Sequence, residues 1–206
     1  MGTLHSRIYL ASQSPRYRDS LKQIGVSFES LLLRNDPRRG IILDEAQRVN
    51  EAIVDCLERT CRAKAVEGQQ TFMSRNLLPL PVLAADTVVV LDDRVIGKPH
   101  DQNESTAMLQ ALSGRQHQLL SGVAVAFQNH VTFRLTRTTV TFAKLAQDRI
   151  AHYVLSNEGS DRAGAYAIDG FGAAFVTQIE GSHSALFGLP LYETVELLRE
   201  AGLPVW

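Results

Sequence analysis

The chain has 206 residues, of which 45% are hydrophobic and 21% are charged, a composition ordinary for a globular protein. This length is enough for one large domain or two small lobes with a hydrophobic core. The formal net charge of −1 excludes a global field that would draw the chain to a nucleic acid polymer or to an anionic membrane. Any phosphate ligand must therefore be held by a few placed cations.

The N-terminal half begins with a short polar stretch that has no apolar core of signal-peptide length, so we expect a cytoplasmic protein. Residues 7–11 are predicted to form a short buried strand. Ser14 is then expected to cap a helix that holds Pro15 in its first turn and runs to about residue 24. A second strand is predicted over 27–33.

A long amphipathic helix is predicted from about residue 44 to 66, followed by an exposed connection over 68–76. Its apolar stripe consists of Val49, Ile53, Leu57 and Cys61. The two cysteines, Cys56 and Cys61, match no zinc or redox spacing. We expect both to be small buried residues in a reducing compartment.

The second half of the chain alternates predicted strands and helices. The expected strands are 81–90, 95–96, 118–127, 131–142 and 173–179, and the expected helices are 104–112, 149–155 and 190–201. Asp92 and Asp93 are predicted to form the turn of a hairpin, so hairpins interrupt the alternation. The sequence therefore predicts an α/β fold around a mixed twisted sheet flanked by helices, in a single domain over 1–206.

The segment 12–16, between the first strand and the first helix, is suited to a phosphate. A helix N-terminus offers free N–H groups and partial positive charge. The Ser12 hydroxyl adds a donor, and the Arg16 guanidinium matches phosphate oxygens. The segment lacks the glycines of a P-loop. The alternative is an ordinary helix cap with a surface arginine.

Asp86 stands alone in the apolar strand 81–90. A carboxylate inside a buried run is costly unless it is paired, hydrogen-bonded or bound to a metal. Asp86 could bind a divalent metal, act as the base toward water, or both. The alternative is a structural aspartate at a strand edge or bend.

Two loops could complete a site around Asp86. Gly97 and Pro99 fix Lys98 on a short loop soon after the Asp86 strand, although a lysine in such a loop is often a solvated turn residue. The segment 162–172 is rich in small residues, which indicates that its backbone approaches a ligand or another strand closely. The alternative is a plain surface loop, in which Asp169 is a turn residue.

Taken in order, these segments resemble the motifs of the Maf family of nucleotide pyrophosphatases. The matching segments are 10–16 (LASQSPR), 61–65 (CRAKA), 85–87 (ADT), 97–99 (GKP), 112–123 (LSGRQHQLLSGV), 163–166 (AGAY) and 188–191 (GLPL). They span nearly the whole chain at compatible spacing, and the ordered set is more specific than any single motif.

The resemblance implies a Maf/ITPase-like fold with a cleft between two lobes, and hydrolysis of a nucleoside triphosphate to a monophosphate and diphosphate. It also implies a divalent metal, Mg²⁺ or else Mn²⁺ or Co²⁺, and a homodimer. Matched position by position, Asp86 is the catalytic aspartate and a metal ligand, and Glu45 is a second metal ligand. The residues that match the polar lining of the triphosphate cleft are Ser12, Arg16, Lys64 and Lys98.

Four positions depart from the family pattern. Tyr17 replaces a second arginine, Arg162 a lysine, His183 a tyrosine, and Asp169 the glutamine of an IQG motif. In the family branch that acts on dTTP and UTP, the residues matching Arg16, Thr87 and Asp169 bear on base selection. An amide both donates and accepts, as thymine and uracil require, whereas an ionised carboxylate only accepts and complements guanine. We therefore expect a relaxed pyrimidine preference, with a guanine-type nucleotide as the alternative.

Two other functions stay open at this point. One is an enzyme of another class, a phosphatase or a nucleotide kinase-like protein. The other is a non-catalytic nucleotide-binding regulator, for example in septum formation and division control.

Overall fold

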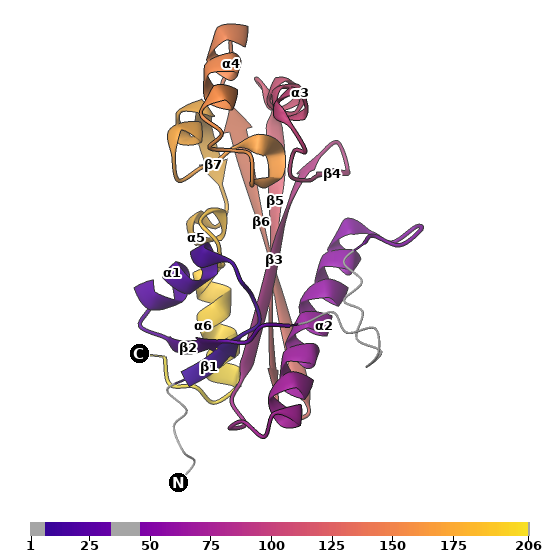
Figure 1. Cartoon of the computed structure of the whole chain (residues 1–206), viewed down its shortest axis with the longest axis vertical. Helices are drawn as coiled ribbons and strands as arrows, with labels where there is room; N and C mark the ends of the chain where they lie inside the picture. The colour runs from indigo at the N-terminus through magenta and orange to yellow at the C-terminus, as the bar shows by residue number, and fades with distance from the viewer. Residues whose placement is uncertain (1–6, 34–45, 206) are drawn as a thin grey trace. The chain divides into compact units, whose positions relative to one another are not determined.

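The computed structural model describes residues 7–33 and 46–205, and Figure 1 shows its helices and strands. In chain order the elements are β1 (Arg7–Leu10), α1 (Pro15–Gln23), β2 (Ser27–Ser30), α2 (Ile53–Ser74), β3 (Val82–Leu91), β4 (Arg94–Ile96), α3 (Gln102–Leu112), β5 (Gln116–Phe127), β6 (His130–Phe142), α4 (Gln147–Leu155), η2 (Ala163–Ala165), η3 (Phe171–Phe175), β7 (Val176–Glu180), α5 (His183–Leu186) and α6 (Leu191–Glu200). None of the helices in these two ranges is both long enough and apolar enough to span a bilayer.

Within the described residues, seven strands form one mixed sheet in the order β2-β1-β3-β5-β6-β7, with β4 paired to β3. β1 runs parallel to both β2 and β3, whereas the β3–β4 and β6–β7 pairs are antiparallel. The β3–β4 hairpin turns at Asp92 and Asp93, whose φ angles of 50° and 57° suit a two-residue turn that follows the twist of the strands. The predicted α/β fold around a mixed sheet is confirmed.

The chain forms two compact units. Unit 1 takes its described residues from 7–33, 46–87, 121–136 and 188–205, and unit 2 consists of 88–120 and 137–187. Strands β3, β5 and β6 therefore supply residues to both units. The single domain expected over 1–206 stays a prediction.

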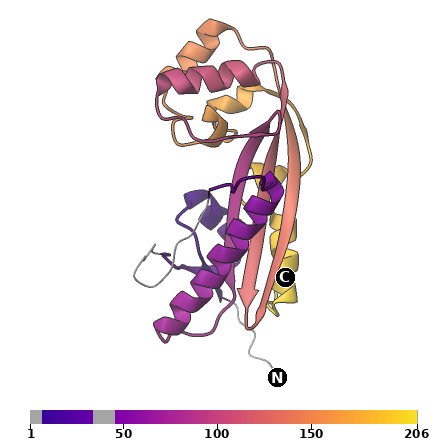
Figure 2. The same ribbon diagram turned by 90° about the vertical axis from the view of Figure 1, so that its right-hand side faces the viewer.

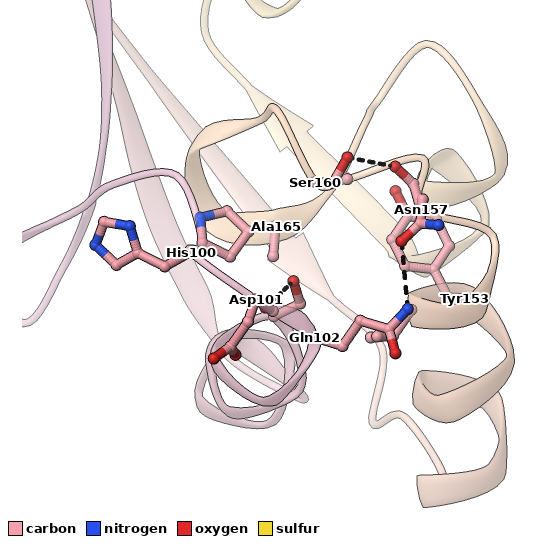
Figure 3. Close-up of a pocket in the computed structure, with 11 residues that line it drawn as sticks. His100, Asp101, Gln102, Tyr153, Asn157, Ser160 and Ala165 are labelled. Atoms are coloured by element: carbon pink, nitrogen blue, oxygen red, sulfur yellow. Dashed lines mark hydrogen bonds between the residues drawn. The ribbon is translucent and has the colours of Figure 1, made fainter.

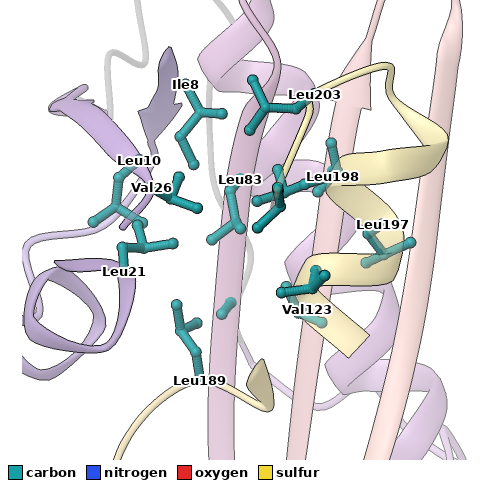
Figure 4. Packing of buried hydrophobic residues seen from close by; sticks show 14 of the residues in the cluster. Ile8, Leu10, Leu21, Val26, Leu83, Val123, Leu189, Leu197, Leu198 and Leu203 are labelled. Atoms are coloured by element: carbon teal, nitrogen blue, oxygen red, sulfur yellow. The ribbon is translucent and has the colours of Figure 1, made fainter. Parts of the chain in front are cut away.

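Unit 1 has an apolar core on one face of its strands and α2 on the other. Val123 and Val125 of β5 belong to a cluster shared with β1, β3, α1 and α6, much of which Figure 4 shows. Gly122 faces the opposite way because successive strand positions alternate. A Cβ at Gly122 would lie 3.1 Å from Leu57 and from Cys61, both on α2. Figure 2 likewise shows α2 and α6 on opposite sides of the strands.

Unit 2 has a separate core built around aromatic rings. Phe142 of β6 packs edge-on against His117 of β5, Tyr166 and Phe175, with ring centroids 5.0, 4.8 and 5.9 Å apart. Tyr153 of α4 packs edge-on against Phe175 at 4.9 Å. Such contacts are worth about 0.5–1.5 kcal/mol each beyond the area they bury. They anchor the irregular segment around η2 and η3 to regular structure.

α2 lies later in the chain than the predicted range of 44–66. It begins at Ile53, and Val49, which the predicted stripe included, is 91% exposed. Leu57 and Cys61 are buried, as predicted. The first two residues of the predicted helix, 44 and 45, lie outside the described ranges.

The exposed connection predicted over 68–76 is wrong, because α2 continues to Ser74. Gly68 is buried inside the helix, where a Cβ would lie 2.6 Å from Val82 Cγ1. The missing side chain therefore lets α2 pack closely on β3. Elsewhere β2 ends at Ser30, earlier than predicted, and the short helix α5 was not predicted.

Candidate functional site

Asp86 lies in the middle of β3, where the strand passes from buried to half-buried residues. Its Oδ2 accepts a hydrogen bond from Lys64 Nζ on α2 at 2.9 Å, and its Oδ1 accepts one from the Thr87 backbone N–H at 2.9 Å. The side chains of Lys64 and Asp86 are 15% and 33% exposed. The carboxylate is thus paired with a cation, as an aspartate in an apolar strand needs to be, and it is still accessible to a ligand.

Thr87 connects Asp86 to a buried polar layer. Its Oγ1 lies 3.1 Å from Ser121 Oγ on β5, and its side chain also hydrogen-bonds the buried Tyr17 of α1. Burial, followed by the negative charge of Asp86, raises the pKa of Tyr17. The phenol is therefore neutral, so a neutral hydroxyl occupies the position where the family resemblance implies a cation.

Cys61 of α2 also lies near Asp86. Burial, and next the charge of Asp86, raise the pKa of the Cys61 thiol to about 12. A thiol with this pKa is protonated at neutral pH and is a poor nucleophile. The expectation of a small buried residue is confirmed for Cys61, whereas Cys56 is only half-buried.

Ser12 and the start of α1 belong to the same unit. β1 pairs with β3, and the Ala11 N–H donates to the Leu83 carbonyl at 2.8 Å, so the end of β1 lies beside β3 shortly before Asp86. Ser12 Oγ accepts a hydrogen bond from the Ser14 N–H at 3.1 Å, which folds the chain into the first turn of α1. Ser14 occupies the N-cap position of α1, as predicted, but its side chain makes no capping hydrogen bond.

Arg16 stands in the first turn of α1, against the segment that precedes α6. Gly188 has a φ of +144°, and a Cβ there would lie 3.3 Å from both the backbone carbon and the Cβ of Arg16. Arg16 and Asp86 both influence the titration of Tyr17, so the three lie within electrostatic range. Unit 1 therefore brings together five predicted residues: Ser12, Arg16, Lys64, Asp86 and Thr87.

Lys98 and Asp169 belong to unit 2. The Gly164 N–H donates to the Gly97 carbonyl at 3.0 Å, which holds the exposed Lys98 loop beside η2. Arg162 precedes η2, and its Nη2 lies 3.6 Å from Asp169 Oδ2. Two of the departures from the family pattern thus form one ion pair.

The metal site is the least complete part of the prediction. Glu45 lies outside the described ranges. Among residues 7–33 and 46–205, no three acidic, histidine or cysteine side chains gather so that they could hold a metal ion. Asp86 offers hard carboxylate oxygens, and Mg²⁺ is usually held by one or two carboxylates together with substrate phosphates. The donor set fits a metal that arrives with the nucleotide.

A pocket of about 200 Å³ opens in unit 2 between the start of α3 and the end of α4 (Figure 3). None of the predicted site residues that the structure describes lines it. Its polar groups are largely bonded to one another: Gln102 Nε2 donates to Asn157 Oδ1 at 3.4 Å, and Ser160 Oγ donates to the Asn157 carbonyl at 2.8 Å.

Sequence reasoning missed three groups around the site. Ser121 stood inside a recognised motif but had no assigned role, and Tyr17 was noted only as a departure from the family pattern. Glu158 was missed altogether, because its partners are backbone N–H groups of residues 13 and 14 positions away. The only signal was the glycine-rich composition of the segment that it contacts.

Comparisons with known proteins identify a family and several named relatives. The family model described as Maf-like protein matches residues 7–201. A protein of Nitrosomonas europaea named dTTP/UTP pyrophosphatase is 46% identical over 97% of this chain and 96% of its own length. One of the same name from Dechloromonas aromatica is 41% identical over 95% and 98%. Among solved structures, the Ham1 protein of Staphylococcus aureus matches 68% of this chain and 72% of its own, at 14% identity and a TM-score of 0.42.

Proposed function

The chain belongs to the Maf-like protein family, and we propose that it hydrolyses nucleoside triphosphates to nucleoside monophosphates and diphosphate, with dTTP and UTP preferred. The names of the relatives support this reaction. The observation in this chain that carries the proposal is the Lys64–Asp86 pair, an accessible carboxylate held at 2.9 Å by a cation.

In the proposed reaction, a water oxygen attacks the α-phosphorus. The bond from that phosphorus to the bridging oxygen breaks, and diphosphate leaves with the bridging oxygen. The Asp86 carboxylate orients the water and accepts its proton. Lys64 holds Asp86 in place and, with Arg16 and the N–H groups at the start of α1, offsets the negative charge of the phosphates.

We propose Mg²⁺ as the cofactor, with Mn²⁺ or Co²⁺ as substitutes. Asp86 and the phosphate oxygens would hold the ion, and Glu45 is the second protein ligand that the family resemblance implies. When bound, the ion supplies positive charge against the triphosphate and its leaving group. This proposal rests on the oxygen chemistry of Asp86 and on its exposure.

For the base, we propose that Asp169 acts together with Arg162. A lone carboxylate only accepts hydrogen bonds, which would favour the adjacent donors of guanine. Arg162 lies 3.6 Å from Asp169 and 3.2 Å from Asp161, so donors stand beside the acceptor. The pair offers both kinds of group, as a glutamine amide does, and thymine and uracil carry both an N–H and carbonyl oxygens. This supports dTTP and UTP over a guanine nucleotide.

A nucleotide panel tests the proposal. We expect diphosphate from dTTP and UTP with Mg²⁺ or Mn²⁺, at a higher kcat/KM than from GTP or dGTP. Orthophosphate as the product would favour a phosphatase instead. Nucleotide binding without turnover would favour the regulator. The same panel on Asp169→Gln tests base selection, since an unchanged ranking would remove Asp169 from it.

We also propose a cytoplasmic location and a homodimer. Cys56 and Cys61 are both thiols, which suits a reducing compartment. Sedimentation equilibrium tests the dimer by distinguishing the monomer mass of 22.7 kDa from twice that value.

A further inference from the structure

The loop that carries Asp169 is held by one carboxylate. Glu158, shortly after α4, accepts hydrogen bonds from the Phe171 N–H at 2.7 Å and from the Gly172 N–H at 3.0 Å. The two carboxylate oxygens take one N–H each. Such bonds to an ionised acceptor are shorter and stronger than those between neutral groups. Two consecutive backbone groups close to Asp169 are therefore fixed by a single side chain.

Gly170 makes room for that carboxylate, and Gly172 makes room for the backbone of Ala167. A Cβ at Gly170 would collide with Glu158 Oε1, and one at Gly172 would lie 2.6 Å from the Ala167 carbonyl. The glycine-rich composition predicted a close approach of the backbone to a ligand or a strand. At Gly170 the backbone approaches Glu158 instead.

Tyr153 of α4 extends the same network to the other side of Asp169. Its hydroxyl accepts a hydrogen bond from the Ala167 N–H at 2.9 Å, and it also hydrogen-bonds the Glu158 carboxylate. Backbone groups at 167, 171 and 172 are thus tied to two neighbouring side chains. Asp169 lies between the tied positions, with Arg162 at 3.6 Å.

Glu158 is ionised at neutral pH. Burial raises its pKa, but the hydrogen bonds from the Phe171 N–H, the Tyr153 hydroxyl and the Gly172 N–H outweigh burial and hold the pKa below its usual range. A neutral side chain of the same shape would lose part of this network, because a glutamine amide presents its NH₂ group to one of the backbone donors.

We infer that Glu158 is a positioning residue for base selection: by holding the backbone of Phe171 and Gly172 it sets the place of Asp169 beside Arg162. Glu158 acts through Asp169. The inference rests on the proposed function, in which the Arg162–Asp169 pair meets the base.

The test compares the selectivity of variants, expressed as kcat/KM for dTTP divided by kcat/KM for dGTP. We expect Glu158→Gln to lower this ratio at least about tenfold, which corresponds to roughly 1.4 kcal/mol of discrimination. Glu180→Gln is the matched control, with the same change of charge at an exposed residue of β7 in unit 2. All assays are run at a temperature at which circular dichroism shows each variant to be folded.

A double variant separates positioning from general weakening. If Glu158 acts through Asp169, Glu158→Gln should change the selectivity of an Asp169→Ala protein by less than twofold, because coupled residues are not additive. Glu158→Asp keeps the charge on a shorter side chain, and we expect a smaller change in the same direction. If Glu158→Gln does not fold, Glu158→Asp takes its place in the test.

Three results would overturn the inference. An unchanged dTTP/dGTP ratio in Glu158→Gln would leave the proposed function intact and remove Glu158 from base selection, as would effects that add fully to those of Asp169→Ala. A wild-type protein that releases no diphosphate and binds no nucleotide would overturn the proposed function, and the inference with it.

Discussion

Lys64 and Asp86 form a pair in which each residue supports the other's charge. Removing one partner of a fully buried pair costs about 3–5 kcal/mol, because the remaining charge is left uncompensated. Asp86 is 33% exposed, so solvent screens much of that loss. The stability of the fold therefore depends only modestly on Asp86. The activity of the protein is the more sensitive measure of what the Asp86 carboxylate does.

Replacing Asp86 with asparagine should separate these two effects. We expect kcat for diphosphate release to fall about 10²–10⁴-fold, because the proton acceptor is lost. The free energy of unfolding should fall by only about 1 kcal/mol. Asp92→Asn is the control, because Asp92 is an exposed turn residue paired with Arg115 at 2.6 Å. A kcat within twofold of wild type would remove Asp86 from the mechanism.

His117 makes the stability of the protein depend on pH. It is 2% exposed, its Nε2 lies 2.8 Å from the Tyr166 hydroxyl, and its Nδ1 has no partner within the described ranges. Burial lowers the pKa of His117 to about 4. Its unfolded value is near 6.5, so between these values the unfolded chain binds a proton that the folded chain does not. Folding is therefore weakened as the pH falls through this window.

Urea unfolding at pH 7 and at pH 4.5 measures this effect. We expect His117 alone to account for a loss of roughly 2–3 kcal/mol between the two conditions. His117→Leu should be less stable at pH 7, because Tyr166 loses its partner, yet it should lose less stability on acidification. His152→Leu, at an exposed position of α4, should keep the wild-type dependence. If His117→Leu also keeps it, another group is responsible.

The long strands β3, β5 and β6 could be predicted from the sequence, whereas the start of α2 could not. Runs of β-branched and apolar residues identify β3, β5 and β6, because such residues are enriched in strands that pack against other elements. Upstream of α2, Arg59 donates to the Glu51 carboxylate at 2.7 Å and to the Ala46 carbonyl at 2.9 Å. Such contacts hold residues 46–51 outside the helix, and a periodic pattern cannot show them.

Gly68 shows how closely two elements can pack. Alanine at this position would favour the helix by about 1 kcal/mol. Its Cβ would lie 2.6 Å from Val82 Cγ1, and overpacking of this kind typically costs about 1–3 kcal/mol. We therefore expect Gly68→Ala to lower the free energy of unfolding by up to about 2 kcal/mol, as measured in urea.

The matched double variant tests the cause of that loss. Val82→Ala removes the methyl group that the new Cβ would meet, so Gly68→Ala should be neutral or stabilising in a Val82→Ala background. If Gly68→Ala costs the same in both backgrounds, its effect does not come from the contact between α2 and β3.

For the molecule as a whole, residue order along the chain predicted much of the candidate site. Ser12, Lys64 and Asp86 are far apart in sequence, and unit 1 brings them together because β1 pairs with β3 and α2 packs on β3. The residues that hold the site in place were harder to find. Tyr17 acts through a side-chain hydrogen bond with Thr87, and Glu158 acts through backbone N–H groups. Neither kind of contact follows from a fixed spacing in the sequence.

At the scale of the whole molecule, we expect the proposed metal to serve catalysis and not the stability of the fold. Within the described part of the chain, no three potential ligands gather at one point. We propose that the ion binds together with the nucleotide and is not a part of the fold. We expect EDTA to abolish diphosphate release and to change the free energy of unfolding by less than about 0.5 kcal/mol. Mg²⁺ alone should restore activity and leave stability unchanged.

Stabilisation should appear only when metal and nucleotide are present together. A non-hydrolysable dUTP analogue with Mg²⁺, at 100 times its Kd, should raise the free energy of unfolding by about 2.7 kcal/mol, because it binds only the folded chain. The analogue with EDTA is the control and should stabilise less, because Arg16, Lys64 and the N–H groups at the start of α1 then meet the charge of the triphosphate without the ion. If EDTA by itself costs several kcal/mol, the metal has enough protein ligands to be structural, and Glu45 would be the first residue to substitute.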